Sequence, residues 1–85
     1  MKLELTYIFE CSGGFKFVRN TPEEIISIFN ENYNAIKEDA KECNITNISC
    51  FVDHTNKYFP KGSISFYLNG ESYRYELRTE VKQLN

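Results

Sequence analysis

The sequence lacks a long apolar run, a large excess of charge of either sign, and any repeat, linker or low-complexity segment. No stretch approaches the roughly 18 apolar residues that a membrane-spanning helix needs. Ten Lys and Arg residues against twelve Asp and Glu give a formal net charge of −2. That balance argues against a protein whose main task is to bind phosphates or anionic lipid. The chain is predicted to be one domain over residues 1–85.

Cysteine is also scarce, and its number is odd. Cys11, Cys43 and Cys50 cannot all pair with one another within one chain. The apolar N-terminal run is interrupted by Glu4 and Glu10, and no small-residue cleavage site follows, so we expect no secretion signal. These features together predict three reduced thiols and a cytoplasmic location.

What the chain does contain is apolar and aromatic material sufficient for one core. At 41% hydrophobic and 15% aromatic residues it is too apolar to be disordered. Residue types with AT-rich codons (Phe, Tyr, Ile, Asn and Lys) far outnumber those with GC-rich codons (Gly, Ala, Arg and Pro). This bias predicts an origin in a low-GC bacterium or in one of its phages or plasmids.

The N-terminal part of the chain is predicted to be a hairpin. Residues 3–10 alternate in polarity with a period of two, which indicates a half-buried strand. A second apolar run, residues 15–19, follows a pair of glycines. We expect Phe9 to face Phe15 across a three-residue loop in which Gly13 takes the left-handed conformation.

The clearest local signal is the start of a helix. Thr21 is a good cap, Pro22 fits the first helical position, and Glu24 completes a capping box. Apolar residues then recur at spacings of three and four as far as Cys43. The pattern predicts one amphipathic helix over residues 22–43 with one buried face.

The second half of the chain is predicted to be three strands. Residues 48–53 alternate, and the run 63–68 leads into Asn69-Gly70, a strong signal for a two-residue turn. That turn sets a register in which Phe66 opposes Tyr73, so the apolar side chains share a face. The polar tail over residues 79–85 is expected to fray.

These elements predict an α+β fold with the order β-β-α-β-β-β. A single amphipathic helix would pack on one face of a mostly antiparallel sheet, which is the simplest way to bury both apolar surfaces. The element order resembles the β-grasp architecture with one extra strand, or a cystatin-like sheet wrapped on a helix. This resemblance carries no family motif and implies nothing about function.

No catalytic residue, metal site or cofactor is predicted. Cys11, Cys43, Cys50 and His54 form a permissible zinc set, but no two cysteines have the spacing of a zinc knuckle. Cys43 and Cys50 are also in phase with the apolar stripes and are expected in the core. A nucleophilic pair of Cys50 with His54 would be separated by about 13 Å along an extended strand.

Two surfaces remain to be explained. The first is the sheet face away from the helix, where Phe51 and Tyr67 are expected to project together with Ile8 and Val18. The second is the loop over residues 57–61. Its two aromatic residues, Tyr58 and Phe59, stand with Pro60 between two lysines, Lys57 and Lys61, a composition typical of binding hot spots.

We therefore expect a non-enzymatic, protein-binding domain that acts by occupying a protein partner. An inhibitor, an antidote or an accessory subunit would fit, including an anti-defence inhibitor encoded by a phage or plasmid. The residues expected to contact the partner are Tyr58, Phe59, Lys61, Lys57, Tyr67 and Phe51. The alternatives are a single-stranded nucleic-acid-binding module that uses exposed aromatic residues, and a homodimeric structural protein.

Overall fold

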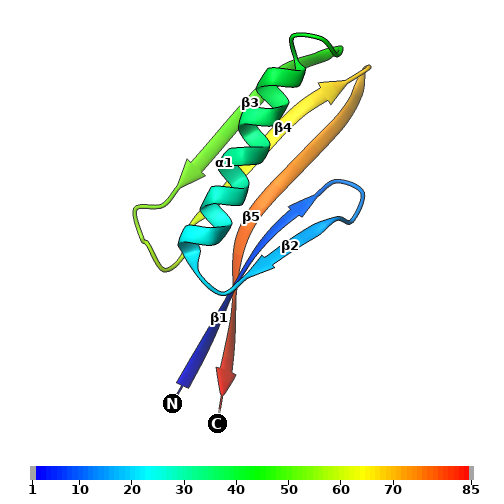
Figure 1. Cartoon of the computed structure of the whole chain (residues 1–85). Coiled ribbons are helices and arrows are strands. Elements are labelled where there is room, and N and C mark those ends of the chain that lie inside the picture. The colour runs from blue at the N-terminus through cyan, green and yellow to red at the C-terminus, as the bar shows by residue number, and fades with distance from the viewer. Residues whose placement is uncertain (1, 85) are drawn as a thin grey trace.

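The fold of the chain, as a computed structural model describes it for residues 2–84, is one helix on a five-stranded antiparallel sheet (Figure 1). The predicted α+β class and element order are confirmed. The elements are β1 (Lys2–Cys11), β2 (Lys16–Arg19), α1 (Pro22–Asp39), β3 (Ile45–Asp53), β4 (Lys61–Leu68) and β5 (Glu71–Leu84).

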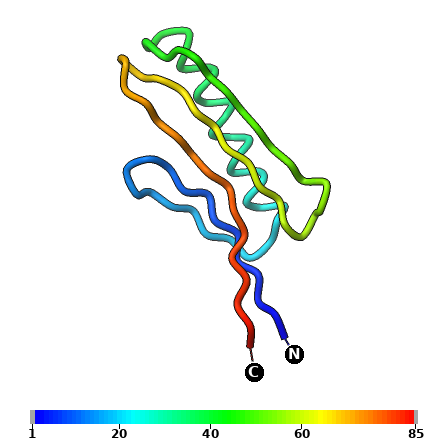
Figure 2. The backbone as a smooth tube through the Cα atoms, turned by 180° about the vertical axis from the view of Figure 1, so that it is seen from behind, coloured from blue at the N-terminus to red at the C-terminus, as the bar shows by residue number. Residues whose placement is uncertain are grey.

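The strands lie in the order β2-β1-β5-β4-β3, so the first and last strands of the chain are neighbours at the centre of the sheet. Each adjacent pair of strands is antiparallel. The helix covers one face, as the view from behind also shows (Figure 2). The other face, which we call the open face, is left without a covering helix by residues 2–84.

The helix begins as its sequence predicts and ends earlier. The side chain of Thr21 accepts a hydrogen bond from the backbone N–H of Glu24 at 3.3 Å, and Pro22 occupies the first turn. The helix stops at Asp39, whereas the sequence pattern predicts helix up to Cys43. Residues 40–43 form turns that bring the chain to β3, and Cys43 is exposed, so the expectation that it belongs to the core is wrong.

The core lies between the helix and the sheet. It is built around aromatic rings: Phe9 of β1 contacts Phe29 of α1 and Tyr75 of β5 edge to face, with ring centroids 5.7 Å apart in both pairs. Such edge-to-face pairs add to the hydrophobic stabilisation of burial. The buried members of this cluster are Tyr7, Phe9, Ile25, Phe29, Ile36, Ile64, Phe66 and Leu77.

The two hairpins differ in how well sequence predicts them. Asn69 and Gly70 both have positive φ, and Phe66 pairs with Tyr73, so the predicted turn and register of β4–β5 are confirmed. In the first hairpin Gly13 has positive φ as expected, but Phe9 pairs with Phe17 and not with the predicted Phe15. Phe15 therefore lies beyond the paired residues and is 63% exposed.

Ile8 is another departure from expectation. The register places its side chain on the open face, between Val18 of β2 and Arg78 of β5. It is nevertheless buried, with 4% of its surface exposed, and so does not contribute to an apolar patch. Of the open-face apolar residues named above, Val18, Phe51 and Tyr67 are the exposed ones.

β1 and β5 extend beyond the other strands of the sheet. β2 pairs with β1 only from Tyr7 to Glu10, and β4 pairs with β5 only from Glu71 to Leu77. Residues 2–6 and 80–84, however, still pair with each other, from Lys2 with Leu84 onward. They project below the helix in Figure 1 and give the molecule its length of 50 Å. We call residues 2–6 and 80–84 the projecting ribbon.

The projecting ribbon corrects the expectation of a frayed tail over residues 79–85. Residues 79–84 continue β5 and pair with β1 over their whole length, while residue 85 lies outside the described part of the chain.

The helix α1, which is the one helix within residues 2–84, does not have the length and apolar character needed to cross a membrane.

Candidate functional site

The loop between β3 and β4, residues 54–60, holds the two aromatic side chains expected at the binding surface. Tyr58 is 56% exposed and Phe59 is 45% exposed. Pro60, the next residue, is buried. The loop therefore holds its proline in the protein and leaves both rings accessible to solvent.

The backbone of this loop is held at both ends and in the middle. At its start the carboxylate of Asp53 accepts hydrogen bonds from the backbone N–H and the hydroxyl of Thr55, at 3.1 and 2.8 Å. In the middle the side-chain oxygen of Asn56 accepts a hydrogen bond from the N–H of Tyr58 at 3.0 Å. These are Asx-type turns, in which a short polar side chain replaces a backbone partner.

The loop is also fixed to the two central strands. The hydroxyl of the buried Tyr7 donates to the carbonyl of Tyr58 at 3.0 Å. The hydroxyl of Thr79 lies 3.5 Å from the carbonyl of Pro60. Burial raises the pKa of the Tyr7 hydroxyl above its ordinary value, with smaller contributions from Glu23 and Tyr58, so it remains a donor. Because the backbone is already ordered, the loop would lose little conformational entropy when a partner binds the exposed rings.

The lysines on either side of the loop have different positions. The ammonium group of Lys57 lies 5.2 Å from the ring centroid of Tyr58, within the range of a cation–π contact. Lys61 begins β4, pairs with Asp53, and lies in the open-face register. Both lysines are exposed.

Phe51 and Tyr67 do not join this loop in one surface. Phe51 pairs with Ser63, and Tyr67 pairs with Ser72. A row of polar residues on the open face, which includes Ser65, separates the two aromatic side chains. Tyr58 and Phe59, by contrast, lie within a loop whose backbone is bonded to side chains on the helix-facing side of the sheet. The six residues expected at one site thus fall into separate regions.

A second set of exposed apolar side chains lies on the same face of β1 and β5, beyond the pair of residues that holds the loop, and sequence analysis missed it. Tyr7 and Thr79, which hold the loop, form one cross-strand pair, and the next pair outward in the same register is Leu5 with Val81. Leu3 and Val81 are 58% and 52% exposed. The signal was present in the sequence, because Thr79, Val81 and Gln83 alternate with charged residues as in a half-buried strand.

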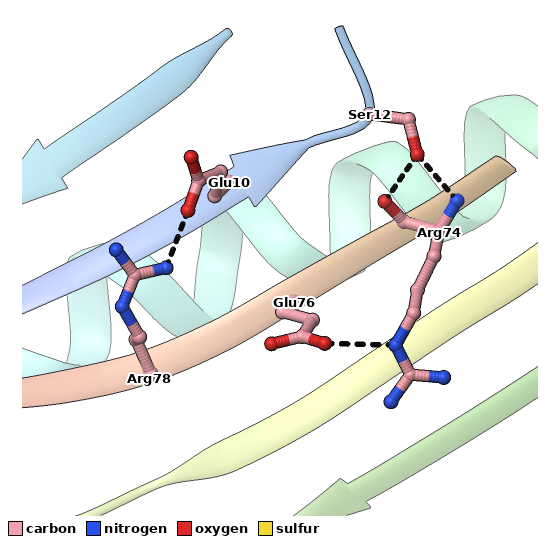
Figure 3. Close-up of polar contacts among 5 residues, drawn as sticks. All are labelled: Glu10, Ser12, Arg74, Glu76 and Arg78. Carbon is pink, nitrogen blue, oxygen red and sulfur yellow. Dashed lines mark hydrogen bonds and ion pairs between the residues drawn. The ribbon is translucent and has the colours of Figure 1, made fainter. Parts of the chain in front are cut away.

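The open face carries alternating charges that largely neutralise one another (Figure 3). The guanidinium of Arg78 contacts the carboxylate of Glu10 at 2.6 Å and that of Glu80 at 3.7 Å. Arg74 contacts Glu76 at 2.8 Å. A hydrogen bond from Arg78 lowers the pKa of the Glu10 carboxyl below its ordinary value. Among the described residues of this face, the guanidinium groups of Arg74 and Arg78 are thus each paired with carboxylates.

A shallow hollow of about 380 Å³ lies between the first hairpin turn and β5. At its rim the hydroxyl of Ser12 donates to the carbonyl of Arg74 at 2.7 Å and accepts from the N–H of the same residue at 2.6 Å (Figure 3). The neighbouring thiol of Cys11 has a pKa raised by burial and by Glu10, which makes it a poor nucleophile. We interpret these contacts as the means by which the turn is attached to β5.

The structure does not assemble the zinc set considered from the sequence. Within residues 2–84, no three side chains of His, Cys, Asp or Glu are grouped so that they could hold a metal ion. Cys43 is exposed near the end of the helix, and Cys11 and Cys50 are partly buried in separate strands.

Searches for similar proteins found no matching protein-family model, curated protein or solved structure.

Proposed function

We propose that this chain is a non-enzymatic, protein-binding domain that acts by occupying a protein partner. The observation that carries the proposal is the loop over residues 54–60, in which a fixed backbone presents the exposed rings of Tyr58 and Phe59. Aromatic side chains on a rigid support provide a large contact area at a low entropic cost.

The surroundings of the loop agree with a protein partner better than with a nucleic acid. The apolar side chains of Leu3 and Val81 lie on the adjacent part of the sheet, and the net charge is −2. A contact centred on Tyr58 and Phe59, with Leu3 and Val81 beside it and Lys57 at its rim, has the apolar centre and polar edge of a protein interface. Phe51, Tyr67 and Lys61 lie on the open face and would contact a partner separately from this surface.

The finer form of the proposal is a small cytoplasmic inhibitor, antidote or accessory subunit, encoded by a low-GC bacterium or by one of its phages or plasmids. Its support is the composition of the chain and the small size of the domain. In each of these roles the domain acts by covering a surface of its partner, and no reaction is required of it.

The test is a comparison of three immobilised proteins exposed to one lysate of the source organism or its host. They are wild type, the double variant Tyr58→Ala/Phe59→Ala, and the control variant Phe15→Ala, which also removes an exposed aromatic ring but in the turn between β1 and β2. We expect quantitative mass spectrometry to find a stoichiometric protein with wild type and Phe15→Ala that the double variant fails to retain. Equal retention by all three would overturn the assignment of the site to this loop.

The same variants distinguish the nucleic-acid alternative. Labelled single-stranded DNA is titrated with each protein at several salt concentrations, because contact with phosphates must weaken as salt increases. We expect no salt-dependent binding by wild type. Binding that decreases with salt and requires Tyr58 and Phe59 would support the alternative in place of the protein partner.

A further inference from the structure

The projecting ribbon is an incomplete piece of sheet. It is two strands wide, and within the described residues neither of its strands has another neighbour over residues 2–6 or 80–84. A two-stranded ribbon is at best marginally stable in water, whereas three or more strands with an apolar face are stable. Its free edges also leave backbone N–H and C=O groups available for another strand.

One face of the ribbon is apolar as well. Leu5 and Val81 form a cross-strand pair on this face, and Leu3 lies next along β1. The other face carries charges, among them Glu4 paired with Lys82, and Glu80. An added strand would therefore have to match an apolar face and a charged face at the same time.

We infer that the edge of β5 pairs with the same edge of a second copy of this chain, antiparallel and centred on Val81. A two-fold axis perpendicular to the sheet keeps the apolar faces of both copies on one side. Directly opposite residues of an antiparallel pair also share a face, so the centre of the pairing must fall on a residue. β5 is unpaired with β4 from residue 78 to residue 84. Within this edge only three centres, Glu80, Val81 and Lys82, allow five or more residues of each copy to pair.

Charge selects one of these centres. Pairing centred on Glu80 places Glu80 opposite its own copy and Lys82 opposite Arg78, and pairing centred on Lys82 places two lysines opposite each other. Like charges directly opposite are destabilising. Pairing centred on Val81 instead places Glu80 opposite Lys82 of the second copy, and the two-fold axis repeats this favourable contact.

The same pairing extends the apolar face. Because Leu5 is already opposite Val81, the dimer would contain an unbroken row of four apolar side chains, Leu5 and Val81 from each copy. On the charged face Glu4, Lys82 and the second copy's Glu80 would alternate in sign along one row. The paired segment runs from Thr79 to Gln83 in each copy. This complementarity is what favours a second copy over an unrelated strand.

The free edge of β1 is less suited to self-pairing. Centred on Glu4, it places two carboxylates opposite each other, which is unfavourable. Centred on Leu3, it pairs Lys2 with Glu4, but only residues 2–4 of the described chain take part. The longer, complementary edge is therefore that of β5, and the inference does not rest on the proposed function of the loop.

The first test is cross-linking at the centre of the pairing. In a Cys43→Ser background, Val81→Cys would place two thiols opposite each other at a separation that a disulfide can span. Leu3→Cys is the matched control, since it lies on the same face with similar exposure but on β1. Under mild oxidation we expect a covalent dimer from Val81→Cys and little from Leu3→Cys. A dimer from Leu3→Cys alone would overturn the inference.

The second test uses charge reversal and measures mass by light scattering over a range of concentrations. We expect wild type to reach twice the mass of the 10.0 kDa chain. Glu80→Lys alone and Lys82→Glu alone each place like charges opposite and should raise the dimer Kd by about tenfold. An equimolar mixture of the two variants restores opposite charges at every position of a mixed dimer, so association should return to the wild-type range.

Each result decides the matter. A wild-type chain that remains monomeric at all concentrations would overturn the inference and leave the edge to a strand of another protein. A wild-type dimer that neither variant weakens, or a mixture that associates no better than its components, would overturn the Val81-centred register. Circular dichroism of each variant verifies folding, and should Lys82→Glu fail to fold beside Glu4, the cross-linking result stands as the test.

Discussion

The hydroxyl of Tyr7 and the backbone carbonyl of Tyr58 are 3.0 Å apart and hydrogen-bonded, although 51 positions separate the two residues in the chain. Tyr7 is in the core, and Tyr58 is in the exposed loop between β3 and β4. This bond connects β1 to the part of the loop that we propose contacts a partner.

Replacing Tyr7 with Phe removes this bond and retains the ring. We expect Tyr7→Phe to lower the free energy of unfolding by about 1 kcal/mol, the usual size of such a loss. We also expect faster hydrogen exchange at the amides of residues 55–59 while exchange in β4 and β5 stays unchanged. Denaturant unfolding measures the change in the free energy of unfolding, and mass spectrometry measures the change in hydrogen exchange. Unchanged exchange in the loop would show that the bond does not order it.

The same hydroxyl predicts behaviour at high pH. Burial raises the pKa of Tyr7 above its ordinary value of 10.0, so the unfolded chain loses this proton more readily than the folded protein. The contribution of the neutral hydroxyl is therefore fully present below pH 10.0 and is lost as the pH rises through the raised pKa. The melting temperature of wild type should fall as the pH rises through this range, and that of Tyr7→Phe should fall less.

Glu10 predicts the opposite dependence at low pH. Its hydrogen bond from Arg78 lowers the pKa of the carboxyl below the ordinary 4.5, so its stabilisation is present above that value and is lost as the pH falls through the lowered pKa. We expect Glu10→Gln to melt at a lower temperature than wild type at neutral pH. The difference should vanish in acid, and a difference that persists there would assign the effect to packing.

Gly62 is a position where one methyl group should be costly. A Cβ atom at this residue would lie 2.7 Å from the carbonyl oxygen of Phe51 and 3.2 Å from the ring of Phe29. We expect Gly62→Ala to destabilise the protein by about 1–3 kcal/mol through overpacking. Ser65→Ala, on the open face of the same strand, is the control and should change stability little. Equal effects in denaturant unfolding would contradict this account.

The three cysteines should differ in reactivity. Cys43 is exposed, whereas burial raises the pKa of the Cys11 and Cys50 thiols, and a thiolate is required for alkylation. We therefore expect iodoacetamide to modify Cys43 first in the folded protein and all three after unfolding. Peptide mapping at short reaction times checks the order. Modification of Cys11 as fast as Cys43 would indicate that the first hairpin opens readily.

The parts of the fold that sequence predicts well are those decided by adjacent residues. Thr21 with Pro22 starts the helix, and Asn69 with Gly70 sets the β4–β5 turn, because in each case the conformation depends on a few neighbouring groups. The helix end is different. No glycine marks it, and the chain leaves the helix at Asp39 to reach β3, which apolar periodicity cannot show.

The pairing of β1 with β5 could not be predicted from adjacent residues, since it joins opposite ends of the chain. Without that partner, residues 79–84 are a polar stretch that would fray, and with it they are half of a ribbon. The candidate site depends on the same pairing. The composition of the loop singles out Tyr58 and Phe59, but their exposure follows only from the structure. The position of Val81, one register pair beyond Thr79 on the same face, follows only from the pairing of β1 with β5.

The central position of β1 also has a consequence for the order in which the molecule is made. Glu10 and Arg78, which meet across the two middle strands, are 68 positions apart, so during synthesis β1 leaves the ribosome long before β5 exists. Until then β2 and α1 can pack against β1, but the edge of β1 that β5 will occupy has no partner. Contacts this distant in sequence make folding slow. The nascent chain therefore passes through a stage in which one edge of β1 is unpaired and accessible to chaperones.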